Sequence, residues 1–284
     1  MANARNKAID NTHLSIDQAE TRGFIHRDYI AHCLRWSHVA KYLNEQQRYK
    51  THHVLDVGCG RDQPLPRLMY TSRLIPQTGS YTGVDYNKLT PHEMFHTGKF
   101  PATFIGGVAF PDVILPRELY DTITCFEVME HVEPAHALLM LEGIHKRLTH
   151  CGTAFISTPC YDEKTGAAAN HVNEMSYTAF GAMLERAGFR IVNVWGTFAS
   201  QKDYKPFLTG SQRELFGALS NYYDSNYLAT IFAPLFPEHS RNCLWRVQHA
   251  DLDRTYKFLR TNDLQLEHHS SSALWPAFAR KELV

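Results

Sequence analysis

The sequence lacks several features that would assign it to a familiar class at once. It has no apolar run of membrane length, and the polar segment 1–11 has no apolar signal core. It has no excess charge, because 29 Lys and Arg balance 29 Asp and Glu. A neutral chain has no general attraction for phosphates, so any basic surface must be local. We therefore expect a soluble, cytoplasmic protein without a membrane segment.

The six cysteines also lack the spacings of a redox motif or a disulfide framework, and no Cys-x-x-Cys pair occurs. They are typical of reduced thiols in a cytosolic protein. Apolar residues, by contrast, are plentiful. A hydrophobic content of 44% in 284 residues is ample for a buried core, and no internal repeat is visible. The chain therefore fits one large domain with extensions.

The most informative segment is 54–60, which reads Val-Leu-Asp-Val-Gly-Cys-Gly. Its apolar run of strand type ends at Gly58 and Gly60, and Pro64 suits the first turn of a helix. Such a turn brings bare backbone and a helix N-terminus up to a ligand. Asp56 lies just before the turn, where a carboxylate could anchor a cation. Because the third glycine of Gly-x-Gly-x-x-Gly is missing, a nicotinamide dehydrogenase fits poorly.

A second apolar segment, 81–85, ends in Asp85 about 25 residues after the glycine turn, which is the spacing of an acid at the tip of the second strand of a doubly wound sheet. A carboxylate at that tip can bind both ribose hydroxyls of an adenosine. The two segments together therefore predict a site for an adenosine-containing cofactor.

The chain resembles class I S-adenosylmethionine (SAM)-dependent methyltransferases over roughly residues 50–200. The glycine motif, Asp85 and the segment 120–131 fall in the order of that family. The resemblance implies an α/β, doubly wound, seven-stranded Rossmann-like fold that binds SAM. The cofactor-binding residues that it implies are Asp56, Gly58, Cys59, Gly60, Asp85, Tyr86, Phe126 and Glu127.

The organisation that we expect has three parts: an N-terminal helical extension (1–48), a methyltransferase domain (49–250) with an insertion at 200–240, and a C-terminal tail (251–284). Within the domain, strand-type and helix-type patterns alternate. The expected strands are 53–57, 81–85, 102–105, 122–126, 153–157, 190–195 and an antiparallel 244–247. The main expected helices are 64–74, 134–148 and 177–187.

A cluster of ionisable residues follows the fourth expected strand, where open α/β sheets place their ligands. If the chain coils there, Glu127, Glu130 and His131 fall at i, i+3 and i+4 on one face. This combination suits a divalent metal or an acid/base pair. Many methyltransferases carry a similar Glu-His without a metal, where it caps the next helix and lines the cofactor.

A later histidine, His171, extends this cluster. The pattern of Glu127, Glu130, His131 and His171 resembles a subset of the family that includes small-RNA 2′-O-methyltransferases and ubiquinone-pathway O-methyltransferases. The resemblance implies that these four residues bind Mg²⁺ or Mn²⁺. It also implies catalytic roles for Glu130, His131 and His171 in methyl transfer to a hydroxyl.

The acceptor is not determined by the sequence, which also says nothing of the oligomeric state. A nucleic-acid end is one candidate, and zero net charge favours a small molecule instead. An acceptor affinity that falls steeply with salt would indicate nucleic acid. A third, non-catalytic possibility is an inactive scaffold that keeps the SAM fold. The basic residues that would support nucleic-acid binding are Arg241, Arg246, Arg254, Lys257 and Arg260.

Overall fold

A computed structural model describes the chain over residues 27–46, 51–74, 79–98, 101–161, 163, 166–199, 208–222 and 233–251. Most of the expected C-terminal tail and the first part of the N-terminal extension lie outside the described residues. The same is true of much of the 200–240 insertion, and of Arg254, Lys257 and Arg260.

The core is a seven-stranded sheet with the strand order β3-β2-β1-β4-β5-β7-β6. The central pairs β1–β2, β1–β4, β2–β3 and β4–β5 are parallel, and β7 runs antiparallel to both β5 and β6. This topology confirms the expected doubly wound fold, including its antiparallel seventh strand. The strands are β1 (His53–Val57), β2 (Ser80–Asp85), β3 (Ala102–Gly106), β4 (Tyr120–Phe126), β5 (Leu148–Pro159), β6 (Phe189–Ala199) and β7 (Ser240–His249).

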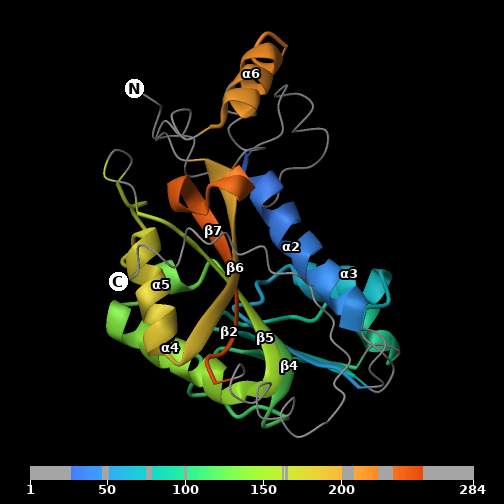
Figure 1. Ribbon diagram of the computed structural model, residues 1–284. Coiled ribbons are helices and arrows are strands. Elements are labelled where there is room, and N and C mark those ends of the chain that lie inside the picture. The colour runs from blue at the N-terminus through green and yellow to red at the C-terminus, as the bar shows by residue number, and fades with distance from the viewer. Residues whose placement is uncertain are drawn as a thin grey trace, which may run out of the picture.

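Helices cover both faces of the sheet. Figure 1 shows α2 (Arg27–Gln46) and α3 (Pro64–Thr71) on one side, and α4 (Pro134–Arg147) and α5 (Tyr177–Arg186) on the other. A further helix, α6 (Gly210–Leu219), extends beyond one end of the sheet within the insertion, where no helix was expected. The short 3₁₀ helices are η3 (Glu93–Thr97), η4 (Met129–His131), η6 (Ala233–Leu235) and η7 (Pro237–His239).

Alternation along the strands divides the apolar side chains between two cores. In β1, Val54 packs with residues of α2 and α3, whereas Leu55 packs in the cluster that holds α4 and α5. The cluster that holds α4 and α5 also contains Trp245, whose ring stacks on the ring of Tyr177 with 4.8 Å between their centroids. Because strands of a doubly wound sheet are buried on both faces, they read as nearly continuous apolar runs.

The helix ends follow local sequence signals. Pro64 and Pro134 lie at the starts of α3 and α4, where a missing N–H costs nothing. The Ser176 hydroxyl accepts a hydrogen bond from Ala179 N at 3.2 Å and so caps α5. Thr209 and Gln212 form a reciprocal capping box at the start of α6. In the part of the chain that the structure describes, no helix has the length and apolarity to cross a bilayer.

The two leucines of α4 allow a matched test of the core. Leu141 is fully buried, while Leu139 is 53% exposed on the same helix. We expect Leu141→Ala to lower the free energy of unfolding by about 2–5 kcal/mol, because it loses apolar burial and leaves a cavity. We expect Leu139→Ala to change it by about 0.5 kcal/mol or less. Denaturant titration measures both, and equal effects would contradict this assignment of the core.

Candidate active site

The turn after β1 requires glycine at position 58 for two reasons, its backbone conformation and the close approach of a neighbouring side chain. Gly58 and Gly60 have φ values of 75° and 72°, which favour glycine. The amides of Gly58 and Cys59 donate to the Val84 carbonyl at 2.8 and 3.1 Å, so the turn is tied to the end of β2. A Cβ at Gly58 would overlap a methyl group of Val128, whereas a Cβ at Gly60 would enter open space. The turn therefore packs tightly on one side and is open on the other.

Asp85 anchors the same turn from the tip of β2. Its carboxylate accepts a hydrogen bond from Gly60 N at 2.9 Å, and it also accepts from the backbone and side-chain nitrogens of Asn87 at 2.8 and 3.0 Å. The sequence interpretation missed Asn87, which follows Asp85 by two residues. Tyr86, between them, is 78% exposed. A ligand that lies along the open side of Gly60 thus meets a fixed acid at the strand end.

Two of the expected cofactor residues lie beneath the turn. The Asp56 carboxylate is buried and accepts hydrogen bonds from Tyr81 Oη at 2.8 Å and Thr124 Oγ1 at 2.7 Å. Burial raises the pKa of Asp56 to about 6, although the two hydroxyl hydrogen bonds oppose this shift. Burial also raises the pKa of Cys59, which keeps it a neutral thiol. The side chains of Asp56 and Cys59 are therefore buried in the protein and support the turn from beneath.

Glu127 does not share a helical face with Glu130 and His131, so that expectation is wrong. Its φ is +55°, and η4 begins only at Met129. The reason is tertiary, because Glu127 N donates to Ser157 O at 3.0 Å and turns the chain away from a continuous helix. The Glu127 carboxylate instead accepts hydrogen bonds from Ser157 Oγ and Asn242 Nδ2, each at 2.8 Å.

Arg35 of α2 completes the surroundings of Glu127. Its Nη1 lies 2.7 Å from Glu127 Oε1, its side chain is 2% exposed, and its guanidinium carbon lies 5.9 Å from the centre of the Phe126 ring. This ion pair fixes α2 against the carboxyl ends of β4 and β5. The sequence interpretation missed Arg35, although an arginine between Leu34 and Trp36 interrupts the apolar pattern of the helix.

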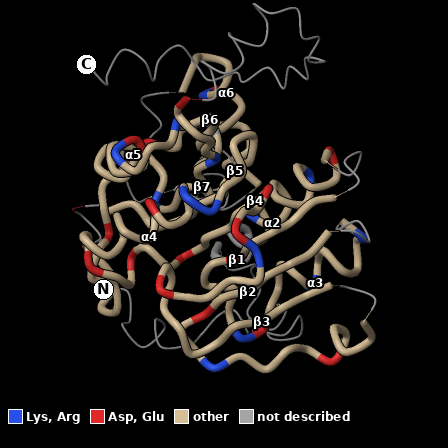
Figure 2. The backbone as a smooth tube through the Cα atoms, turned by 90° about the horizontal axis from the view of Figure 1, so that it is seen from below, with Lys and Arg blue, Asp and Glu red and all other residues tan. Residues whose placement is uncertain are grey.

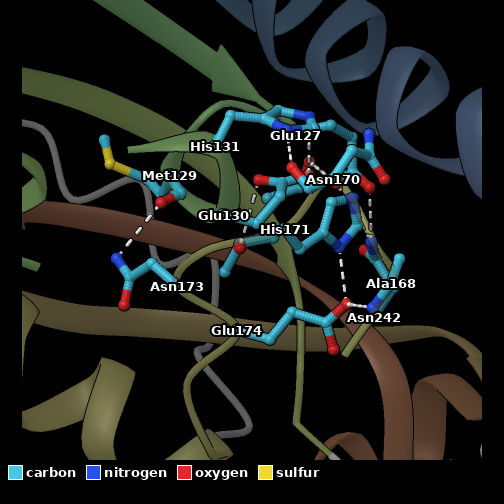
Figure 3. A network of polar contacts seen from close by, with 12 residues as sticks. Glu127, Met129, Glu130, His131, Ala168, Asn170, His171, Asn173, Glu174 and Asn242 are labelled. Carbon is cyan, nitrogen blue, oxygen red and sulfur yellow. Dashed lines mark hydrogen bonds and ion pairs between the residues drawn. The ribbon is translucent and has the colours of Figure 1, made fainter. Parts of the chain in front are cut away.

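Glu130, His131 and His171 come together from two separate segments. Their potential ligand atoms all lie within 4.8 Å of one another, and Figure 3 shows the three side chains gathered in one place. Glu130 is 1% exposed, and burial together with the charge of Glu127 raises its pKa well above the usual value. The side chain of His131 is 41% exposed, so the group opens to solvent on one side.

The two imidazoles are oriented by their Nδ1 atoms. His131 Nδ1 lies 3.1 Å from the Asn170 carbonyl oxygen, and His171 Nδ1 lies 2.5 Å from Glu174 Oε1. A carbonyl or a carboxylate only accepts, so each Nδ1 carries the proton and donates it. In the neutral rings, Nε2 is then left with the lone pair. Two imidazole nitrogens and one carboxylate are a set that can bind a divalent metal or move a proton.

The strand order, together with the glycine turn beside Asp85, defines a Rossmann-like methyltransferase fold. Residues 34–194 match the family described as "Methyltransferase domain". The match covers more than half of the chain, and the protein therefore belongs to this methyltransferase domain family.

Solved structures of two methyltransferases are similar to this chain, and one of them reaches a TM-score of 0.50. The magnesium protoporphyrin IX methyltransferase of Synechocystis PCC 6803, with bound S-adenosylhomocysteine (SAH), has a TM-score of 0.50 at 11% identity, over 84% of this chain and 89% of that chain. The 1,6-didemethyltoxoflavin-N1-methyltransferase of Burkholderia thailandensis has a TM-score of 0.48 at 15% identity, over 76% and 79%. At such identities the likeness concerns the fold alone. A search of curated proteins gives no match.

The buried Asp56 should make stability depend on pH. Its pKa rises from 3.8 to about 6 on folding, so its contribution is most favourable below pH 4 and is lost as the pH rises through 6. We expect Asp56→Asn, which removes this titration, to gain stability relative to the native protein by about 3 kcal/mol between pH 4 and pH 7. Denaturant unfolding at several pH values measures this difference. A constant difference across that range would contradict the assignment.

Proposed function

We propose that the protein transfers the methyl group of SAM to a hydroxyl oxygen of its acceptor, with the assistance of a divalent metal. The observation that carries this proposal is the convergence of Glu130, His131 and His171. Family membership supports the methyl transfer itself. The choice of oxygen as the acceptor atom and the involvement of a metal both rest on the chemistry of the converging side chains.

The donor would lie along the open side of the glycine turn. Asp85 would hold the ribose hydroxyls, while Gly58 and Gly60 admit the methionine part of SAM. Both the Synechocystis and the Burkholderia enzymes were solved with bound SAH, which supports a SAM site in this fold. The remaining residues that we propose to border or support the cofactor are Asp56, Cys59, Tyr86, Phe126 and Glu127.

The donor site and the histidine cluster are neighbours because β1 and β4 are paired. Val57 lies opposite Cys125 in this parallel pair, so the glycine turn and the segment after β4 leave the sheet at the same edge. Val128 packs directly against Gly58. A methyl group carried by SAM in the turn would therefore lie near the segment that carries Glu130.

The side chains present fit a divalent metal. One carboxylate oxygen of Glu130 and the Nε2 atoms of His131 and His171 would hold it. The carboxylate suits Mg²⁺, and two imidazoles suit Mn²⁺ at least as well. Glu127 was predicted as a fourth ligand. Its carboxylate is already engaged by Arg35, so our proposal gives the main role to the other three residues.

The reaction requires alignment and the removal of one proton. An acceptor oxygen forms a bond to the methyl carbon as the carbon–sulfur bond breaks, and the electron pair of that bond stays on sulfur to give SAH. The chain mainly holds the two reactants in line. A bound metal would lower the pKa of the acceptor hydroxyl. His131 or His171, if free of metal, offers an Nε2 lone pair to accept the proton.

We propose a small molecule as the acceptor. Arg241 is paired with Glu174 at 2.5 Å, and Arg246 lies half-buried over the ring of Tyr42 at 4.9 Å. Neither guanidinium is therefore presented to a phosphate backbone. Figure 2 shows acidic and basic residues interspersed along the described chain. Nucleic-acid binding relies on clustered basic residues that are free to contact phosphates. The two described members of the predicted basic set, Arg241 and Arg246, are both engaged within the protein.

The metal proposal can be tested without knowing the acceptor. We expect the native protein to bind Mn²⁺ in a calorimetric titration, and Glu130→Ala to weaken this binding by about 10- to 100-fold because a first ligand is lost. Glu133→Ala is the matched control, since it removes an exposed carboxylate three residues away. Equal Mn²⁺ affinity of Glu130→Ala and the native protein would rule out this site.

The donor site is tested separately by SAM binding. We expect Asp85→Ala to lower SAM affinity by at least about tenfold, because it removes both the ribose contact and the anchor of Gly60 N. Glu118→Ala, at an exposed position, should bind SAM as the native protein does. Calorimetric titration with SAM measures these affinities. Failure of the native protein to bind SAM would favour the inactive-scaffold alternative.

A further inference from the structure

Behind His171, on the side away from Glu130, lies the carboxylate of Glu174. Its Oε1 is 2.5 Å from His171 Nδ1 and accepts a second hydrogen bond from Ala168 N at 3.0 Å. Its Oε2 is 2.5 Å from a guanidinium nitrogen of Arg241. The Glu174 side chain has no exposed surface. Figure 3 shows Glu174 next to His171 within the polar network of the site.

Glu174 is an anion in this setting. Its carboxylate lies against the guanidinium of Arg241 and accepts a hydrogen bond from Ala168 N, and this arrangement of donors stabilises the ionised form. An ionised carboxylate has no proton to donate. The proton between Glu174 and His171 must therefore come from the ring, at Nδ1.

Arg241 holds Glu174 in place from a distant part of the chain. It lies in β7, and its guanidinium also donates to the backbone carbonyls of Cys160 and Gly166 in the segment after β5. A backbone hydrogen bond also joins β7 to the residue after β5, because Cys160 N donates to Arg241 O at 2.8 Å. The segment that carries His171 is thus anchored to the sheet through an ion pair whose arginine is 11% exposed.

We propose that Glu174, held by Arg241, is a positioning residue that fixes His171 in its Nδ1–H tautomer and so directs the Nε2 lone pair at Glu130 and His131. This inference rests on the proposed function for its purpose, because a lone pair at Nε2 serves either a metal or an acceptor proton. The predicted tautomer of His171 does not depend on either use. Glu174 itself touches neither reactant.

The tautomer can be read directly by nitrogen NMR of the imidazole rings in the metal-free protein, recorded over a pH series so that the neutral form of each ring is observed. The His171 signals are assigned by their loss in His171→Gln. We expect the Nδ1–H tautomer in the native protein. In Glu174→Ala we expect the proton to move to Nε2, wholly or in part, because no acceptor holds it at Nδ1. Glu185→Ala, at an exposed position on α5, should leave the spectrum unchanged.

A second variant controls for local unfolding. Glu174→Ala leaves Arg241 buried without its partner, whereas the double variant Glu174→Met, Arg241→Met removes both charges at similar volume. We expect the same loss of the Nδ1–H tautomer in both. His145 and His249, hydrogen-bonded at 2.8 Å at the opposite edge of the sheet, report whether each variant is folded. An Nδ1–H tautomer retained in both folded variants, or absent from the native protein, would overturn the inference.

Metal binding separates this inference from the proposed function. If the metal proposal is right, Glu174→Ala should weaken Mn²⁺ binding by about 10- to 100-fold, as loss of an outer partner of a ligating histidine does. If the native protein binds no Mn²⁺ while its His171 tautomer still depends on Glu174, the inference stands and metal assistance fails. If Mn²⁺ binds equally well to the native protein and to both variants, and the His171 tautomer is also the same in all three, the positioning role is refuted.

Discussion

The parallel pairing of β1 with β4 is the constraint on which the site depends. The chain leaves these neighbouring strands in opposite directions, toward α3 on one face of the sheet and α4 on the other. Their carboxyl ends therefore lie at one edge with no crossover connection above them, which is where open α/β sheets bind ligands. The glycine turn follows one strand and the Glu127–His131 segment follows the other, so the pairing brings these two segments together. Val172 N and Asn173 N donate to Glu130 O and hold the His171 segment beside them.

Two ion pairs join separate elements at this edge, and each contains one side chain with almost no exposed surface, Arg35 at 2% and Glu174 at 0%. Arg35 brings α2 to Glu127, and Arg241 brings the start of β7 to Glu174. Buried charges are tolerated only when they are paired and hydrogen-bonded, and removal of one partner typically costs about 3–5 kcal/mol. Both pairs therefore specify where helix, strand and loop meet. Each also engages a carboxylate, Glu127 or Glu174, within the protein.

The site residues differ in what they contact. A Cβ at Gly60 would enter open space, and Asp85 beside it is buried and hydrogen-bonded to Gly60 N. The potential ligand atoms of Glu130, His131 and His171 lie close to one another. Asp56 and Cys59 belong to the same motif but lie underneath it, where they support the turn through buried contacts. One sequence motif thus contains both open backbone, at Gly60, and supporting side chains, at Asp56 and Cys59.

Much of this protein could be predicted from its sequence, because the relevant signals are local. Apolar runs broken by glycine and proline predicted all seven strands. Three of the residues singled out by their positions, Glu130, His131 and His171, lie together in the structure. Tertiary structure decided the rest. Arg35, Glu174 and Asn242 acquire their roles only from partners far along the chain, and the left-handed backbone of Glu127 is held by Ser157 on a neighbouring strand. Spacing along the chain cannot reveal such contacts, since they depend on which strands become neighbours in the sheet.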